Sequence, residues 1–409
     1  CELRKRLVHA PCNAMGRQSR GRRPEAATPQ KDLPADGPRG VLSASWLRSP
    51  TIWAGSILAL VPAAWLTLRR SRPADDVDLA WVRESVKDES GDLVATICNQ
   101  ELGMNFLTFG EIVIGAQYVL EEYKDQAAFT GFAVQESILF VNRSLKHVLQ
   151  LGLGAGVVAT FLRSQQIKVD VVELSTSVLY MAEKYFGFQP CCAHDVAHAP
   201  PHACTGVPDA PDCRSRRGMS VRSEAREYLS QQPLNRYDAI ISDVFAGSNP
   251  GHMHSKEVFI RMKQSWLEPA GILVVNFVGF HRGVHSRITH QLAATLRSVF
   301  AAVRCFRDQS LEQEPNIAAN LVCFASDSPF RFNVPRTGNF QHPPPLSTFW
   351  VMRNFQNWEV LRKTDGTVGI IEDAKNELSN TSSQKEIKLQ LQRHARTMIP
   401  DQVWQTLEK

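Results

Sequence analysis

Three glycines and one acid have the types and spacing of a nucleoside-binding turn. Gly152, Gly154 and Gly156 form a G-x-G-x-G turn between an apolar run at residues 147–151 and a helix-like segment. Glu173 ends a second apolar run about 20 residues further on, the position of a ribose-binding acid. Glycines let the backbone approach a ligand, and the following helix N-terminus offers free N–H groups. The pattern predicts nucleoside binding; a tight turn with a solvent-exposed Glu173 is the alternative.

A second acid follows another apolar run. The segment "YDAIISDVF" (237–245) reads as a strand that reaches Asp243. Ligands of open α/β sheets bind outside the carboxyl ends of the strands, so Asp243 could face the same crevice as the turn. A carboxylate there could accept or position the proton of an amine nucleophile. Capping of the next helix is the alternative role for Asp243.

The elements that must position these residues alternate along the chain. Apolar strands alternate with helical segments, and a late strand pair follows at 303–308 and 320–325. This order predicts an α/β fold with a Rossmann-like sheet of the class I S-adenosylmethionine-methyltransferase type. Short β-rich runs broken by glycines precede it and predict a small N-terminal β-region.

Composition divides the chain into regions. The uncharged stretch at 51–68 is flanked by arginines and, at about 18 residues, just reaches the length of a membrane span. It predicts a single-pass membrane protein of undetermined compartment; a cleaved targeting segment or a buried helix is the alternative. The mixed-charge helix within 376–409 is expected to be solvated or to dock, without forming a site. The expected regions are a disordered basic N-terminus (1–45), a transmembrane or targeting segment (46–72), the β-region (77–125), a nucleoside-binding domain (126–335) with an inserted loop (191–218), and a C-terminal extension (336–409).

Charge and cysteine usage limit the partners. The positive excess lies in the N-terminal residues, and the remaining body is slightly acidic, so we expect no nucleic-acid partner. Cys98, Cys305 and Cys323 stand in apolar runs and are expected to be buried free thiols, which suits a reducing compartment. The Cys- and His-rich stretch at 191–213 has no zinc-finger spacing, so no metal is expected.

Several segments together resemble the spermidine synthase (polyamine synthase) family. They are "FGEIVIGAQYV", "FAVQESILF", "VLQLGLGAG", "VDVVEL", "YDAIISDVF" and "LEPAGILVVNF". The chain is most similar to a divergent eukaryotic branch with an upstream membrane segment, over residues 90–330. The resemblance implies decarboxylated S-adenosylmethionine or S-adenosylmethionine as donor, and a small-molecule amine or other acceptor.

The resemblance also assigns roles to individual residues. Asp243 would be catalytic, as the first Asp of the family's catalytic loop. Glu173 would bind the donor ribose, Glu224 would contact the adenine amino group, and Gln135 would line the donor pocket. The residues implied for donor binding are Gln135, Gly152, Gly154, Gly156, Glu173 and Glu224.

Three positions depart from the family pattern. Ala155 replaces an Asp of the turn, Ala246 replaces the second Asp of the catalytic loop, and Val134 replaces a Tyr. The groups that would hold the aminopropyl end and the amine are therefore reduced. Three hypotheses stay open: aminopropyl transfer to an amine, as in polyamine biosynthesis; S-adenosylmethionine-dependent methyl transfer; and a non-catalytic nucleoside-binding or scaffold protein. Homo-oligomerisation also stays open.

Overall fold

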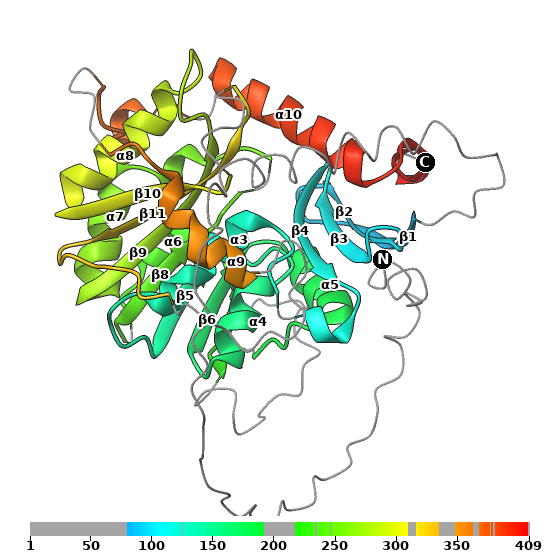
Figure 1. Cartoon of the computed structure of the whole chain (residues 1–409), viewed down its shortest axis with the longest axis horizontal. Helices are drawn as coiled ribbons and strands as arrows, with labels where there is room; N and C mark the ends of the chain where they lie inside the picture. The colour runs from blue at the N-terminus through cyan, green and yellow to red at the C-terminus, as the bar shows by residue number, and fades with distance from the viewer. Residues whose placement is uncertain are drawn as a thin grey trace, which may run out of the picture. The chain divides into compact units, whose positions relative to one another are not determined.

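An eight-stranded mixed sheet is the largest element of the structure, in the order β12-β10-β11-β9-β8-β5-β6-β7 (Figure 1). The computed structural model describes residues 80–124, 126–191, 217–233, 235–245, 247–309, 316–334, 348–362, 368–376, 378 and 381–407. The parallel strands are β5 (His147–Leu151), β6 (Lys168–Glu173), β7 (Ser220–Arg222), β8 (Tyr237–Ser242) and β9 (Leu267–Gly279). The antiparallel strands are β10 (Ala302–Arg307), β11 (Ala319–Ser326) and β12 (Glu359–Val360).

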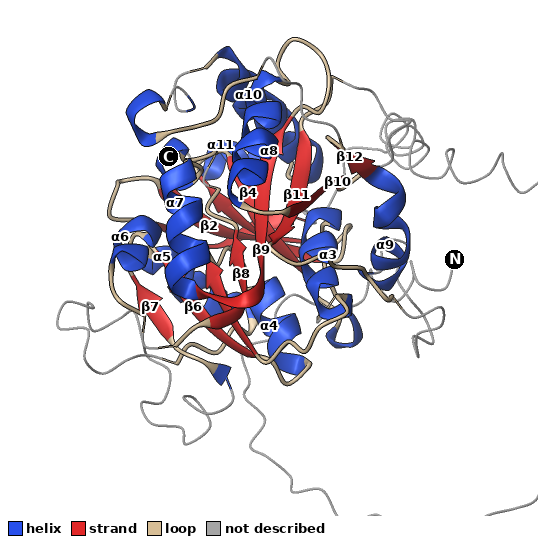
Figure 2. Ribbon diagram, turned by 90° about the vertical axis from the view of Figure 1, so that its left-hand side faces the viewer, coloured by secondary structure: helices blue, strands red, loops and turns tan. Residues whose placement is uncertain are grey.

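Helices cover both faces of this sheet, which explains why the inner parts of its strands are largely apolar. Along β5, Val148 belongs to one hydrophobic cluster and Leu149 to another, since successive side chains of a strand point to opposite faces. Figure 2 shows α6 and α7 on one side and α3 and α9 on the other. The predicted α/β class with a Rossmann-like sheet is confirmed. The helices around the sheet are α3 (Thr130–Glu136), α4 (Val157–Ser164), α5 (Thr176–Phe186), α6 (Ala225–Ser230), α7 (Lys256–Arg261), α8 (Arg287–Val299) and α9 (Thr348–Asn354).

A second, four-stranded antiparallel sheet precedes the main one. Its strands follow chain order: β1 (Ala80–Lys87), β2 (Leu93–Asn99), β3 (Met104–Phe109) and β4 (Ile112–Tyr118). The C-terminal helices α10 (Ser382–Met398) and α11 (Asp401–Leu407) pack against it, as Figure 1 shows for α10 beside β4. Ala395 and Trp404 share a hydrophobic cluster with Ile97 and Phe106. The end of the chain is thus part of the folded body.

The cysteine prediction is wrong at the positions that the structure describes. Cys305 and Cys323 face each other in the β10–β11 register and form a disulfide. Cys98 and Cys191 each take part in a disulfide as well. An apolar strand sequence does not distinguish a free thiol from a disulfide-bonded cysteine. Whether two cysteines lie within bonding distance depends on the register of the paired strands. The reducing compartment inferred from free thiols loses its basis.

The predicted membrane segment at 51–68 and most of the inserted loop, residues 192–216, lie outside the described residues. Among the helices that the structure does describe, none is both long enough and apolar enough to cross a bilayer. This finding contradicts the single-pass membrane localisation predicted from the sequence, and that assignment is withdrawn.

Candidate functional site

The glycine turn lies against two other parts of the backbone. Gly152 has φ +82°, and a Cβ placed there would lie 2.1 Å from the carbonyl oxygen of Asp243. A Cβ at Gly154, where φ is +54°, would lie 3.1 Å from the carbonyl oxygen of Ile114 in β4. L-residues with side chains rarely adopt such φ values, and no room exists for one at Gly152. The turn is therefore fixed between the loop after β8 and the N-terminal sheet.

Glu173 at the end of β6 binds the turn through its carboxylate. Its Oε2 accepts the backbone N–H of Leu153 at 2.8 Å, and its Oε1 accepts that of Ser175 at 2.9 Å. Burial raises the pKa of Glu173 although these backbone bonds act to lower it. The backbone N–H groups of Leu174 and Gly154 also act on this carboxylate, which offers about four acceptor positions in all.

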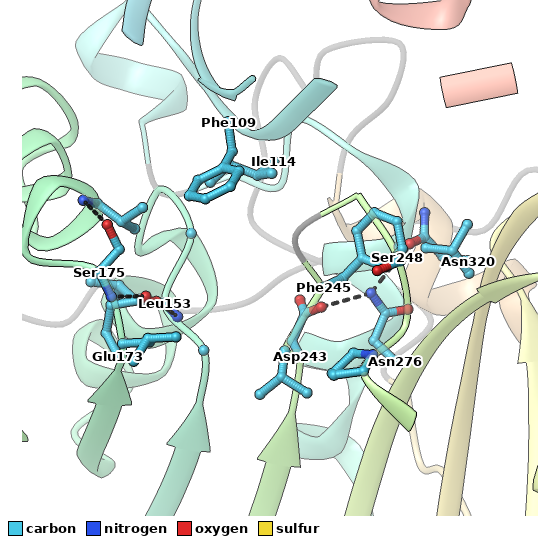
Figure 3. A pocket seen from close by; sticks show the side chains of 18 of the residues that line it. Phe109, Ile114, Leu153, Glu173, Ser175, Asp243, Phe245, Ser248, Asn276 and Asn320 are labelled. Carbon is cyan, nitrogen blue, oxygen red and sulfur yellow. Dashed lines mark hydrogen bonds between the residues drawn. The ribbon is translucent and has the colours of Figure 1, made fainter. Parts of the chain in front are cut away.

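Asp243 lies on the other side of the turn. Strand β5 runs between β6 and β8, so Glu173 and Asp243 flank the point where the strand order reverses. Figure 3 shows the two acids at separate strand ends, with Phe109 and Ile114 of the N-terminal sheet over the space between them. One cavity of about 720 Å³ is lined by both acids and by the turn. The volume falls in the range of small-molecule sites.

Two side-chain amides hold Asp243 in place. Asn276 Nδ2 in β9 donates to its Oδ1 at 2.9 Å, and Gln135 Nε2 in α3 donates to its Oδ2 at 2.8 Å. Burial raises the pKa of Asp243, and the two amide bonds act against that rise. Gln135 is fully buried and contacts Asp243, whereas the cavity wall, which it was predicted to line, is formed by other residues.

Glu224 lies at the rim of the same cavity, at the N-cap of α6. Its carboxylate accepts the N–H of Glu227 at 2.8 Å and contacts His252 Nε2 at 3.1 Å. Burial acts to raise the pKa of Glu224, but the hydrogen bonds from the α6 backbone and His252 together lower it. Glu224 is thus ionised and already engaged by the helix it caps. Leu174, another residue of the cavity lining, has 61% of its surface exposed.

The cavity wall is acidic and is completed by the C-terminal helix. Leu391, His394 and Met398 of α10 line it, although the sequence analysis expected this helix to lie away from any site. Their spacing puts them on one helix face, which is a signal that the sequence does contain. Arg222 is the single Arg or Lys of the described lining. The acidic residues of the lining are Asp88, Glu89, Glu173, Glu224, Asp243 and Asp308.

Sequence reasoning missed a polar chain that continues from Asp243 across three strands. Asn276 Nδ2 also donates to Asn320 Oδ1 of β11 at 3.2 Å, and Asn320 Nδ2 donates to Asp308 Oδ2 at 2.7 Å. Asp308 follows β10 directly. We call Asn276 and Asn320 the amide bridge. In the sequence, each is a polar residue within a buried strand. Its bonding partner can be assigned only when the strand order is known.

Comparisons with known proteins agree with this architecture. No protein-family model matches the chain. A polyamine aminopropyltransferase of Vibrio vulnificus is 29% identical over 174 residues, which cover 41% of this chain and 48% of that protein. An N-terminal histidine N-methyltransferase of Emericella nidulans is 23% identical over 351 residues, which cover 78% of this chain and 57% of that protein. The chain spans about half the length of these curated relatives.

A solved structure shares the fold. The probable spermidine synthase from Corynebacterium glutamicum ATCC 13032 superposes with a TM-score of 0.51 at 17% identity, over 73% of this chain and 99% of that one. The chain has a spermidine-synthase-like fold. A likeness at this level of identity concerns the fold alone, so the reaction has to be argued from the site.

Proposed function

We propose that this protein is a transferase that moves an alkyl group from an S-adenosyl-type sulfonium to a nitrogen of a small-molecule amine. The observation that carries the proposal is the single cavity in which Glu173 and Asp243 flank a glycine turn. A crevice at the reversal of strand order is the general ligand site of open α/β sheets. The acidic lining suits a cationic donor and a cationic acceptor.

The residues around the turn fit a nucleoside. The backbone of Gly152 and Gly154, which line the cavity, would lie against the donor, and the carboxylate of Glu173 would take its ribose hydroxyls. Gly156, predicted to act with them, lies beside Phe188 and does not line the cavity. Leu174 would cover one face of the base, and Glu224 at the α6 N-cap would accept the amino group of the base. Such a donor supplies an electrophilic carbon on a positively charged sulfur.

Asp243 would act on the acceptor. An amine is a nucleophile only when it is unprotonated, so a carboxylate beside it must take or position its proton. Gln135 and Asn276 leave Asp243 one orientation, in which each oxygen already accepts one amide hydrogen. Holding the base in a fixed geometry next to the nucleophile lowers the activation barrier in addition to the effect of its basicity.

Aminopropyl is the first candidate for the transferred group. The resemblance to spermidine synthases and the similarity to the Vibrio aminopropyltransferase support it. Methyl is the second candidate, favoured by Ala155. This residue is 2% exposed and lies against Gly115 of β4, so an apolar methyl stands where the family has a carboxylate. The similarity to an N-methyltransferase over most of the chain also supports methyl transfer.

Donor binding and product analysis test the proposal. Calorimetric titration with S-adenosylmethionine, its decarboxylated form and methylthioadenosine is expected to detect binding of at least one of the two sulfonium donors. Mass spectrometry of an amine acceptor incubated with the bound donor then identifies the added group. Preference for the decarboxylated donor supports aminopropyl transfer, and preference for the intact donor supports methyl transfer. Binding of neither donor would contradict the proposal and leave a scaffold role.

A further inference from the structure

A second carboxylate lies deep in the cavity, at the far end of the amide bridge from Asp243. Asp308 is 5% exposed, lines the cavity, and uses Oδ2 to accept the Asn320 amide at 2.7 Å. Its Oδ1 is buried and has no hydrogen-bond partner among the residues that the structure describes. A buried carboxylate oxygen without a donor is costly, so a ligand that donates a hydrogen bond there would be stabilised.

The orientation of the amide bridge determines what that group must be. Ionised carboxylates only accept hydrogen bonds, so Asn276 turns its NH₂ toward Asp243 and Asn320 turns its NH₂ toward Asp308. Both hydrogens of Asn276 are used, because the second one goes to Asn320 Oδ1. Its own Oδ1 is left buried and unpartnered within the described part of the chain. Of the described residues that line this end of the cavity, Asp308 and Asn276 thus each keep an unpaired acceptor, and the complementary ligand group is a hydrogen-bond donor.

Charge makes a cationic donor the better fit. Burial raises the pKa of Asp308 to about 6, even though the nearby Arg307 guanidinium acts to lower it. Arg307 is itself fully buried, and its Nη2 donates to the carbonyl oxygen of Ile317. A protonated amine would offset the desolvation of the Asp308 carboxylate and satisfy its open position with a charge-assisted bond.

We propose that Asp308 binds a protonated nitrogen of the acceptor other than the nitrogen that is alkylated. Asp308 then supplies the carboxylate that the sequence lacks at Ala246 and acts as a specificity-determining residue. The inference rests on the proposed function, since it concerns the acceptor of the same reaction. Asp243 keeps the reacting nitrogen, because it lies beside the glycine turn, whereas the amide bridge separates Asp308 from it.

The test measures how well small amines bind before any chemistry. Calorimetry with 1,4-diaminobutane and 1-aminobutane is carried out on protein saturated with methylthioadenosine. The wild-type protein should bind the diamine more than about tenfold more tightly, because one charge-assisted hydrogen bond is added. In Asp308→Asn, which can still accept the Asn320 amide, that preference should disappear. In Asp308→Glu, which keeps the charge, part of it should return.

A matched substitution separates the loss of this site from a general change of charge. Asp327 is half-exposed, pairs with Lys263 at 2.8 Å and does not line the cavity. Asp327→Asn removes the same charge and should leave the preference for the diamine unchanged. A preference that persists in Asp308→Asn would overturn the inference, and so would equal binding of both amines by the wild-type protein. The wild-type comparison stands even if a variant fails to fold.

The same titrations separate the two proposals. If methylthioadenosine and both sulfonium donors fail to bind the wild-type protein, the proposed function fails. If the nucleoside binds and the diamine shows no advantage, only the role of Asp308 fails. Product analysis with the diamine separates the two proposals further. If the group is transferred and the KM for the diamine does not depend on Asp308, the proposed function holds and the role of Asp308 is wrong.

Discussion

The two sides of the cavity are built in different ways. The proposed donor side, defined as the Gly152–Gly156 turn and Glu173, uses backbone geometry and one carboxylate from a short piece of chain. The proposed acceptor side, defined as Asp243, the amide bridge and Asp308, uses side chains from four separate strands or strand ends. Local structure thus determines the donor side, whereas strand order determines the acceptor side.

This difference has a physical consequence for substitutions. On the donor side, Glu173 holds two backbone N–H groups, so changes there alter a rigid turn and the affinity for a nucleoside. On the acceptor side, each polar group depends on the next, since Asn276 bonds both Asp243 and Asn320. Hydrogen-bond networks of this kind are coupled, so changes there should affect catalysis and acceptor choice together.

The largest expected effect is on the acceptor side. Asp243→Asn preserves the shape of the side chain but removes the proton acceptor. If transfer to an amine occurs, its single-turnover rate at saturating donor should fall by roughly 10²–10⁴-fold, as is typical of a lost general base. Donor affinity measured by calorimetry should barely change, because the turn and Glu173 are untouched. Full activity of Asp243→Asn would show that Asp243 has only a structural role. It would contradict the assignment of acceptor chemistry to this side of the cavity.

The arrangement of the turn and Glu173, which form the proposed donor side, could largely be predicted from the sequence. Gly152, Gly154 and Gly156 fall in one short motif, and Glu173 follows at the end of the next strand. The β5–turn–α4–β6 unit is continuous in sequence, so its parts must be neighbours once the strands pair in parallel. The fold class follows from the same alternation of strands and helices.

The acceptor side could be predicted only in part. Asp243 is recognisable as an acid at a strand end, but Asn320 and Asp308 are linked to it through Asn276 only because β11 lies antiparallel between β9 and β10. The Cys305–Cys323 disulfide could not be predicted for the same reason, since it depends on the register of β10 and β11. The bond from Gln135 to Asp243 could not be predicted, because a helix pattern shows which residues share a face but not which neighbour they bond.

The next effect is expected on the donor side. Glu173→Ala removes the proposed ribose acceptor and the two backbone bonds that the carboxylate makes. Nucleoside affinity should fall by more than about tenfold, since charge-assisted hydrogen bonds are lost. Glu173→Gln retains one amide oxygen as an acceptor, so its nucleoside affinity should lie between those of the wild-type protein and Glu173→Ala. Titration with methylthioadenosine measures both variants.

A glutamate at the opposite edge of the sheet provides the control for that experiment. Glu268 is exposed at the amino-terminal end of β9, away from the carboxyl edge where the cavity lies. Glu268→Ala should bind the nucleoside as the wild-type protein does. Unchanged affinity in Glu173→Ala, with thermal melting confirming the fold, would remove Glu173 from the donor site. Reduced affinity in Glu268→Ala would point to a general effect of charge.

The smallest effect should come from the buried residue that holds Asp243 from α3. Gln135→Leu keeps the volume of the side chain but removes the 2.8 Å bond to Asp243 Oδ2. That bond favours the ionised carboxylate, so its loss should raise the pKa of Asp243 beyond the rise that burial already causes. Since only the ionised form accepts a proton, the acidic limb of the kcat/KM profile should move to higher pH. Below the limb, activity should fall severalfold, in keeping with about 0.5–1.5 kcal/mol for one hydrogen bond. Above it, activity should approach that of the wild-type protein, whereas the rate of Asp243→Asn should stay low at every pH. A limb that does not move would mean that Asn276 alone sets the charge state of Asp243, and that the acceptor side extends only along the strands.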